Sequence, residues 1–234
     1  MISINADTHC NDITINKMNS DINGLSIMAK GSGNTLLIES GAKINNLKIE
    51  LIGDHNSVII RKGAIFFGGS LSVSHKASVN IGLRCRFGNR LELIAEKASI
   101  IFGDDCMLAA GVQLRTTDSH PIFDLASDTK INQCKSIEVS DYCWIGKNVT
   151  ILKGAQIQPC SSVGINSTVT GKTTPFSVWA GSPAKLVKSD VIWSRLNKID
   201  SYLDEPIIVR YLKKYKDLIP EGLRDTIVKK IESF

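Results

Sequence analysis

The sequence has few aromatic residues and no long apolar run. Aromatic residues make up 6% of its 234 residues, although apolar residues as a whole make up 43%, so a core must be built mainly from aliphatic side chains. No stretch approaches the roughly 18 consecutive apolar residues of a membrane-spanning helix. The N-terminus also lacks the basic region and apolar run of a signal peptide. We therefore expect a cytoplasmic protein without a transmembrane segment.

Histidine is scarce and cysteine is unpaired. The six cysteines form no CxxC motif, which favours reduced thiols in a cytoplasmic protein. Of the four histidines, His55 and His75 are one residue out of register between successive repeats and would face opposite ways. We therefore expect no histidine-based metal site. The net charge of +5 is compatible with an anionic substrate or cofactor, but it falls short of a nucleic-acid footprint.

A six-residue repeat dominates residues 139–170. An aliphatic residue recurs at every sixth position, and four residues after each of the first five comes a small or compact one. This period fits neither a helix nor an alternating strand, but it is a signature of parallel β-helices. The aliphatic positions are Val139, Ile145, Ile151, Ile157, Val163 and Val169.

The N-terminal half repeats with a longer period. Its anchor residues Ile38, Ile60, Ile81 and Phe102 are 22, 21 and 21 residues apart. Each coil there is three hexapeptides plus three or four residues, which we place as bulges at a corner. Three cysteines fall on the small-residue corner position, so packing explains them: Cys85, Cys106 and Cys143. The first coil begins within residues 1–30, without a clear anchor.

The repeat stops at residue 115 and resumes after residue 136, which predicts a loop extruded from the prism. Long loops inside compact domains are usually functional. Within this loop only His120 can exchange a proton near neutral pH, and Asp118, Ser119 and Pro121 beside it can fix its position. His120 is therefore the candidate base, although a lone histidine more often has a structural role.

From residue 189 the periodicity becomes helical. The pattern predicts three helices: one from Ser189 or Asp190 through Leu203, a second that begins at Pro206 and ends at Pro220, and a third that reaches Phe234. A solenoid needs its ends covered, so this tail caps the last coil or packs on a neighbouring subunit. Its basic residues are interspersed with acidic ones, which favours a solvated face.

Two further groups could carry chemistry. Trp144 stands at an outward-facing position of its hexapeptide, either as an interface residue or as a platform with an N–H to donate. Lys172, Lys185 and Lys188 follow the last coil, where they would suit a phosphate-rich cofactor or serve only solubility. The Gly171-Lys172-Thr173 stretch is not a P-loop, because the required earlier glycine is Asn166.

Three motifs carry a resemblance to a known family. They are Asp118-Ser119-His120-Pro121, Trp144-Ile145-Gly146-Lys147-Asn148-Val149 and Ala180-Gly181-Ser182-Pro183-Ala184-Lys185. With the repeat, they resemble the hexapeptide-repeat acyltransferases over residues 81–188. They are most similar to the O-acetyltransferases of bacterial surface polysaccharides, including the sialic-acid capsule enzymes, and to the galactoside and maltose acetyltransferases.

The resemblance implies an all-β solenoid, a left-handed parallel β-helix over residues 1–188 with the loop 115–136 extruded, followed by a helical tail at 189–234. It also implies a homotrimer in which acetyl-CoA lies in a groove between two solenoids and a saccharide hydroxyl is the acceptor.

Residue roles follow from the same resemblance. His120 is the general base and Trp144 a catalytic and donor-site residue. Asn89, Asp118 and Ser119 would contact the acceptor. The family's threonine–lysine pair appears here as Thr170-Gly171, with the lysine displaced to Lys172. The residues expected to hold acetyl-CoA are Trp144, Lys147, Ile165, Thr170, Lys172, Lys185 and Lys188.

Two other functions stay open from the sequence. An N-acetyltransferase acting on a nucleotide-linked amino sugar or an amino acid would share the fold and the donor but differ in the acceptor. A scaffold without catalytic activity would share only the fold. Binding of acetyl-CoA separates the scaffold from both enzymes, and acceptor screening separates the two enzymes.

Overall fold

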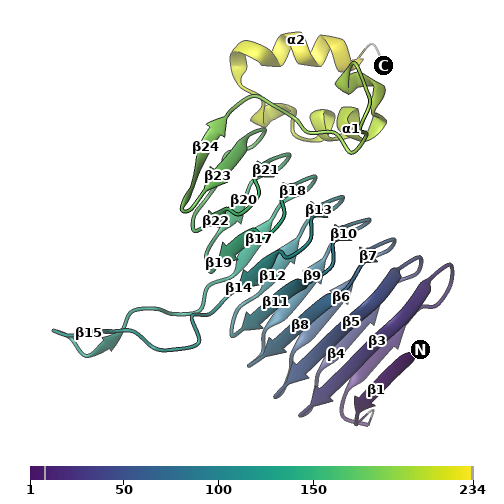
Figure 1. The fold of residues 1–234 in the computed structure, drawn as a ribbon, viewed down its shortest axis with the longest axis vertical. Helices are drawn as coiled ribbons and strands as arrows, with labels where there is room; N and C mark the ends of the chain where they lie inside the picture. The colour runs from purple at the N-terminus through teal and green to yellow at the C-terminus, as the bar shows by residue number, and fades with distance from the viewer. Residues whose placement is uncertain (8, 233–234) are drawn as a thin grey trace.

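The computed structural model describes residues 1–7 and 9–232. Short parallel strands stack coil upon coil into a prism with three rows of strands, and helices lie at its C-terminal end (Figure 1). Each coil visits the rows in the same order before the chain moves to the next coil. The left-handed parallel β-helix expected from the sequence is confirmed.

The three rows are named here in the order in which a coil visits them. Row I contains β2 (Asp12–Ile15), β4 (Thr35–Ile38), β6 (Ser57–Ile60), β9 (Ser78–Ile81), β12 (Ile100–Phe102), β17 (Ile137–Val139) and β20 (Gln156–Ile157). Row II contains β7 (Ile65–Phe66), β10 (Arg86–Phe87), β13 (Met107–Leu108), β18 (Trp144–Ile145), β21 (Ser162–Val163) and β23 (Val178–Gly181). Row III contains β8 (Gly69–Ser74), β11 (Leu91–Glu96), β14 (Gln113–Arg115), β19 (Thr150–Leu152) and β22 (Thr168–Val169).

The N-terminal coils join two rows in one strand. β3 (Asp21–Lys30) and β5 (Lys43–Ile52) each run through row II and on into row III, and β1 (Ile2–Ala6) pairs with the second part of β3. At the other end, β24 (Ala184–Lys188) folds back antiparallel on β23. The first strand is thus β1, which the sequence did not locate.

The predicted register is confirmed. Ile38 pairs with Ile60, and Ile60 with Ile81, on neighbouring coils of row I. After the loop the step shortens to 18 residues, since Val139 pairs with Ile157. These side chains are buried inside the prism, which is filled by Ile, Leu and Val. The three corner cysteines are buried too.

The extra residues of the N-terminal coils lie in strands, not in corner bulges. β11 in row III has six residues, whereas β19 in the same row has three. The placement of bulges at a corner was therefore wrong. Longer strands keep every added N–H and C=O group in the parallel ladder, whereas a bulge leaves a residue unpaired. The prism consequently widens toward its N-terminal end (Figure 1).

The tail contains two of the three predicted helices. α1 (Pro206–Lys214) and α2 (Glu221–Glu232) are confirmed, with short 3-10 turns η1 (Tyr202–Asp204) and η2 (Lys216–Leu218) before each. α1 already ends at Lys214, and Pro220 directly precedes α2. Phe234 lies outside the described residues. No helix among the described residues is long and apolar enough to cross a membrane.

The helix predicted from residue 189 to Leu203 was wrong. The segment 191–201 is irregular, and two of its side chains bond to the prism. The Trp193 indole N–H donates to the Tyr142 carbonyl at 2.7 Å, and Arg195 donates to the carbonyl of Asp105. The tail therefore packs on a corner of its own prism. The division of the chain into domains at 1–188 and 189–234 stays a prediction.

Candidate functional site

His120 lies on an exposed turn at the base of the extruded loop. The loop leaves row III after β14 and contains a small hairpin, β15 (Phe123–Asp124) and β16 (Thr129–Lys130), that projects from the prism (Figure 1). The N–H of His120 donates to the Asp118 carbonyl at 2.8 Å, and the Asn132 side chain donates to the His120 carbonyl at 2.8 Å. Asp118 before the hairpin and Asn132 after it thus fix the backbone of His120, while the imidazole stays exposed.

Asp118 and Ser119 hold this turn in place. The Asp118 carboxylate accepts from Asn132 at 2.9 Å and pairs with Lys153, which follows β19. The Lys153 ammonium lowers the pKa of Asp118, with a further contribution from Asn132. The Ser119 hydroxyl accepts from Arg115 at 3.0 Å. Asp118 and Ser119, two of the three residues predicted to bind substrate, are therefore already engaged in positioning the turn that carries His120.

Trp144 forms a wall of an apolar hollow of about 200 Å³ on row II. Its side chain is 42% exposed. Ile165 lines the same hollow, so the structure brings together two of the residues predicted to hold the cofactor. The hollow's remaining lining residues are Gly146, Ser162, Val163, Gly164, Val178, Val191, Ile192 and Trp193.

Glycine at position 146 is required by the close approach of the next coil. A Cβ there would lie 2.8 Å from the Ile165 nitrogen and 2.8 Å from the Val163 carbonyl oxygen, well inside normal contact distance. The coils can therefore pass closely beside Trp144, and the hollow keeps a smooth, apolar floor. Such a slot fits an uncharged, chain-like group better than a charged one.

The tail supplies the opposite wall of this hollow, which sequence reasoning missed. The Trp193 ring lies 6.0 Å from the Trp144 ring between centroids and stacks on Tyr142 at 4.6 Å. Trp193 was counted in a helix, and no sequence motif marks it. Only its position as a lone tryptophan just after the repeat could have drawn attention to it.

The predicted phosphate-binding residues lie near the end of the prism. Thr170 and Lys172 line a second, small hollow of about 100 Å³ with Trp179 and Ala184. Lys185 and Lys188 lie on β24, which begins at Ala184. Lys147 lies at an exposed corner, where its carbonyl accepts from the N–H of Asn166 at 2.9 Å. Lys147 thus lies in the same coil as Trp144, whereas Lys172, Lys185 and Lys188 follow in the last coils.

His120 and Trp144 lie on different parts of the prism. Trp144 belongs to β18 of row II, whereas His120 follows β14 of row III and is tied to Lys153, beyond the end of β19. His120 is not among the residues that line the hollow of Trp144. One prism therefore presents the predicted base and the predicted donor site at two separate places.

Comparison with known proteins gives the family. No family model matches the sequence. A polysialic acid O-acetyltransferase of Neisseria meningitidis is 35% identical over 192 residues, which cover 82% of this chain and 89% of that protein. The chain belongs to the polysialic acid O-acetyltransferase family. It is an acetyltransferase.

Two further members of the family support this assignment. The enzyme of Escherichia coli O1:K1 / APEC is 36% identical over 137 residues; the match covers 58% of this chain but only 45% of that protein. The crystal structure of the polySia-specific acetyltransferase NeuO superposes with a TM-score of 0.85 at 32% identity, covering 91% of this chain and 98% of that one. The similarity extends over the N-terminal coils and the tail, which the sequence motifs did not reach.

Asn89, predicted to contact the acceptor, lies two coils before Trp144 and does not line its hollow. It is an exposed corner residue after β10, and a Cβ placed on Gly68 would touch its Cβ at 3.9 Å. In this acetyltransferase it therefore borders the surface of the N-terminal coils of row II.

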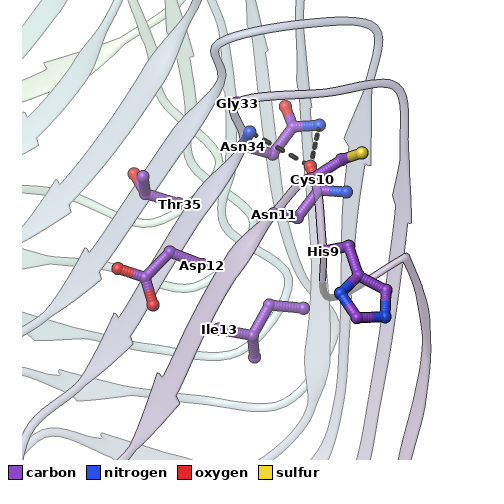
Figure 2. Close-up of a pocket in the computed structure, with 8 residues that line it drawn as sticks. All are labelled: His9, Cys10, Asn11, Asp12, Ile13, Gly33, Asn34 and Thr35. Atoms are coloured by element: carbon purple, nitrogen blue, oxygen red, sulfur yellow. Dashed lines mark hydrogen bonds between the residues drawn. The ribbon is translucent and has the colours of Figure 1, made fainter.

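The N-terminal end of the acetyltransferase carries a hollow of about 530 Å³ (Figure 2). His9, Cys10 and Asp12 line it beside a buried ladder in which Asn34 donates to Asn11 at 2.9 Å. The hollow lies at the free edge of β2, remote from the predicted site residues. In the described residues, no three His, Cys, Asp or Glu side chains gather as metal ligands would.

Proposed function

We propose that this protein transfers the acetyl group of acetyl-CoA to a hydroxyl of an acidic bacterial capsule polysaccharide of the polysialic acid type. The observation that carries the proposal is the apolar hollow between Trp144 and Trp193, in a chain whose relatives are named polysialic acid O-acetyltransferase. We place the reaction in the cytoplasm, which agrees with six free cysteines.

The donor would lie along row II toward the last coils. The apolar slot beside Trp144 suits the thioester and the uncharged arm of acetyl-CoA, because it offers contact area without a charge to desolvate. The cations of the last coils, among them Lys172, Lys185 and Lys188, suit its phosphates. Lys185 and Lys188 lie on β24, which pairs with β23 of row II, whereas Lys172 bridges to Gln156 of row I.

His120 would remove the proton of the attacking sugar hydroxyl. A hydroxyl is a poor nucleophile, and a general base typically contributes about 10²–10⁴ in rate. As the hydroxyl oxygen bonds to the thioester carbon, the proton passes to His120 and negative charge develops on the carbonyl oxygen. The Trp144 indole N–H or a nearby backbone N–H would stabilise that oxyanion. Collapse expels the CoA thiolate, which takes up a proton, so no covalent enzyme intermediate is needed.

The separation of His120 from Trp144 favours a site shared between two copies of the chain. His120 of one prism would then face Trp144 of its neighbour, which gives a homotrimer with three equivalent sites. The projecting loop supports this arrangement. Leu125 at its tip is 100% exposed, and three more large apolar side chains beside it are also exposed: Ile122, Phe123 and Ile131. An arm of this kind needs a partner surface.

The test is the His120→Ala enzyme. With sialic acid polymer as acceptor, kcat should fall by about 10²–10⁴ while acetyl-CoA binding changes little, since the histidine acts on the acceptor.

His9→Ala is the matched control, because His9 lies at the N-terminal end of the prism. A folded His120→Ala protein that retains more than about a tenth of the native rate would refute the base assignment. Transfer to amino sugars but not to sialic acid hydroxyls would show that the protein is an N-acetyltransferase and not an O-acetyltransferase. Failure to bind acetyl-CoA would favour the remaining alternative, a scaffold without catalytic activity.

A further inference from the structure

A second hollow lies on row II, in the N-terminal coils. It has a volume of about 460 Å³. Its rim carries side chains of several kinds on successive strands: one aromatic ring, two cations, two amides and one carboxylate. In that order they are Phe67, Lys43, Arg86, Asn23, Asn45 and Asp21.

Strand alternation directs all of these side chains outward. Lys43 and Asn45 flank the buried Ile44 on β5, and Arg86 precedes the buried Phe87 on β10. Phe67 is 51% exposed. On the neighbouring coil, the residue after Phe87 is Gly88, which has no side chain to cover the Phe67 ring. An exposed aromatic face therefore lies beside a gap in the row.

The polar groups of this hollow have no protein partner in the described residues. Lys43, Arg86 and Asp21 take part in none of the ion pairs found there, and the Asn45 amide makes no side-chain hydrogen bond. By contrast, the nearby Arg84 is held by Asp105 at 2.7 Å. Two free cations against one carboxylate give the hollow a positive balance that suits an anionic ligand.

The hollow lies on the same row of strands as Trp144, with the partly buried Met107 between them. Arg86 pairs with Met107, and Met107 with Trp144, so two strand spacings separate Arg86 from the donor site. That is about 10 Å, and Lys43 lies about 19 Å away at four spacings. Row II thus presents one surface along which a polymer could extend from the reaction site, and Asn89 borders that surface.

We propose that this hollow, called here the row II subsite, binds an acidic sugar unit of the acceptor polymer remote from the unit that is acetylated. Arg86 and Lys43 would pair with the sugar carboxylate, Arg86 through two parallel N–H bonds. The Phe67 face would pack on the C–H face of the sugar ring, and the Asn23 and Asn45 amides would bond to hydroxyls. The subsite rests on the proposed function, because it assumes that the acceptor is an anionic polysaccharide.

The experiment measures how the acceptor KM depends on chain length. Sialic acid monomer and sialic acid oligomers of increasing length serve as acceptors for the native enzyme and for Arg86→Ala, Phe67→Ala and Arg86→Lys. We expect Arg86→Ala to raise the KM of long oligomers about tenfold, since one charge-assisted contact pair is lost. The effect should shrink as the oligomer becomes too short to reach the subsite, and Arg86→Lys should restore part of the affinity.

Lys30→Ala is the matched control, because this cation belongs to the same N-terminal coils but ends β3 in row III. It should leave the length dependence unchanged. Added salt should raise the KM of long oligomers for the native enzyme more than for Arg86→Ala. The oligomeric state of each variant is measured by light scattering.

Three results would overturn the proposal: an unchanged KM for long oligomers, an equal rise for monomer and polymer, or a change of oligomeric state that makes this face a subunit contact. Calorimetric titration with a long sialic acid oligomer measures binding at the subsite independently of acetyl transfer. If the native protein binds the oligomer through Arg86 but transfers no acetyl group, the proposed function fails and the subsite stands. If transfer occurs without binding through Arg86, the subsite fails alone.

Discussion

The prism and the tail solve the same packing problem with different residues. Inside the prism, aliphatic side chains from successive coils stack in register, so every coil contributes an interchangeable layer. The tail instead rests on Tyr142, which stacks between Trp193 and Tyr211, and on buried carboxylates. The prism therefore tolerates exchange between aliphatic residues, whereas the tail depends on a few specific partners.

Asp105 shows how specific the tail contact is. Its side chain is fully buried, and it accepts from Arg84 at 2.7 Å and from the Tyr211 hydroxyl at 2.6 Å. Arg210 of α1 pairs with the same carboxylate. Burial alone would raise the pKa of Asp105, but the bonds from Arg84 and Tyr211 outweigh it and lower that pKa. Asp141 is bound in the same manner by Lys214 and Tyr215.

The strongest way to break the prism is to place a charge inside it. Ile151→Asp should unfold or aggregate the whole chain, because it removes a fully buried side chain and buries an unpaired carboxylate. The combined cost is at least about 5 kcal/mol. The matched control is Ile101→Asp, since Ile101 is 38% exposed on the outside of β12. Thermal unfolding followed by circular dichroism compares them; equal losses would mean that the outward and inward positions are misassigned.

Breaking the tail contact should leave the prism folded. Asp105→Asn removes the charge that Arg84, Arg195 and Arg210 share, which should cost about 2–4 kcal/mol because these arginines can be partly rehydrated. Trp193 fluorescence should shift to the red as the tail detaches, while the β-sheet circular dichroism signal persists. Loss of both signals at once would show that prism and tail unfold as one unit.

Acid should release the tail before it affects the prism. The pKa of Asp105 is lowered in the folded protein, whereas an unfolded aspartate titrates near about 3.9. Its contribution is therefore complete above about pH 4 and is lost as the pH falls through the folded pKa, since the unfolded chain then binds more protons. Trp193 fluorescence against pH should show this transition, and Asp105→Asn should lack it.

The smallest effect is expected at β24, the strand that joins prism and tail. If Lys185 and Lys188 contact the phosphates of acetyl-CoA, changing both to alanine should raise its KM several-fold with kcat nearly unchanged, because each exposed contact is worth about 1 kcal/mol. Lys213→Ala on α1 is the control. An equal KM for acetyl-CoA and its dephospho form in the native enzyme would argue against a contact with the 3′-phosphate.

The difference between prism and tail also explains which features could be predicted from the sequence. The step from Val139 to Ile157 could be read directly, because each coil repeats the same inward position and an error in one coil is corrected by the next. The tail offered no such repetition. Its first segment has aliphatic residues at helical spacing, yet Trp193 and Arg195 bond to Tyr142 and Asp105, and these tertiary bonds outweigh a weak helical preference.

The sequence by itself therefore determined the β-helix, the place where the loop leaves it and the residues that fill its interior, because periodic burial leaves a periodic pattern. Only the tertiary structure decided that Trp193 faces Trp144, that Asp118 is tied to Lys153, and that His120 and Trp144 of one chain lie apart. The extra residues of the N-terminal coils form longer strands, which was also decided by the tertiary structure. The hydrogen bonds of the ladder form between neighbouring coils, so no single segment of sequence specifies them.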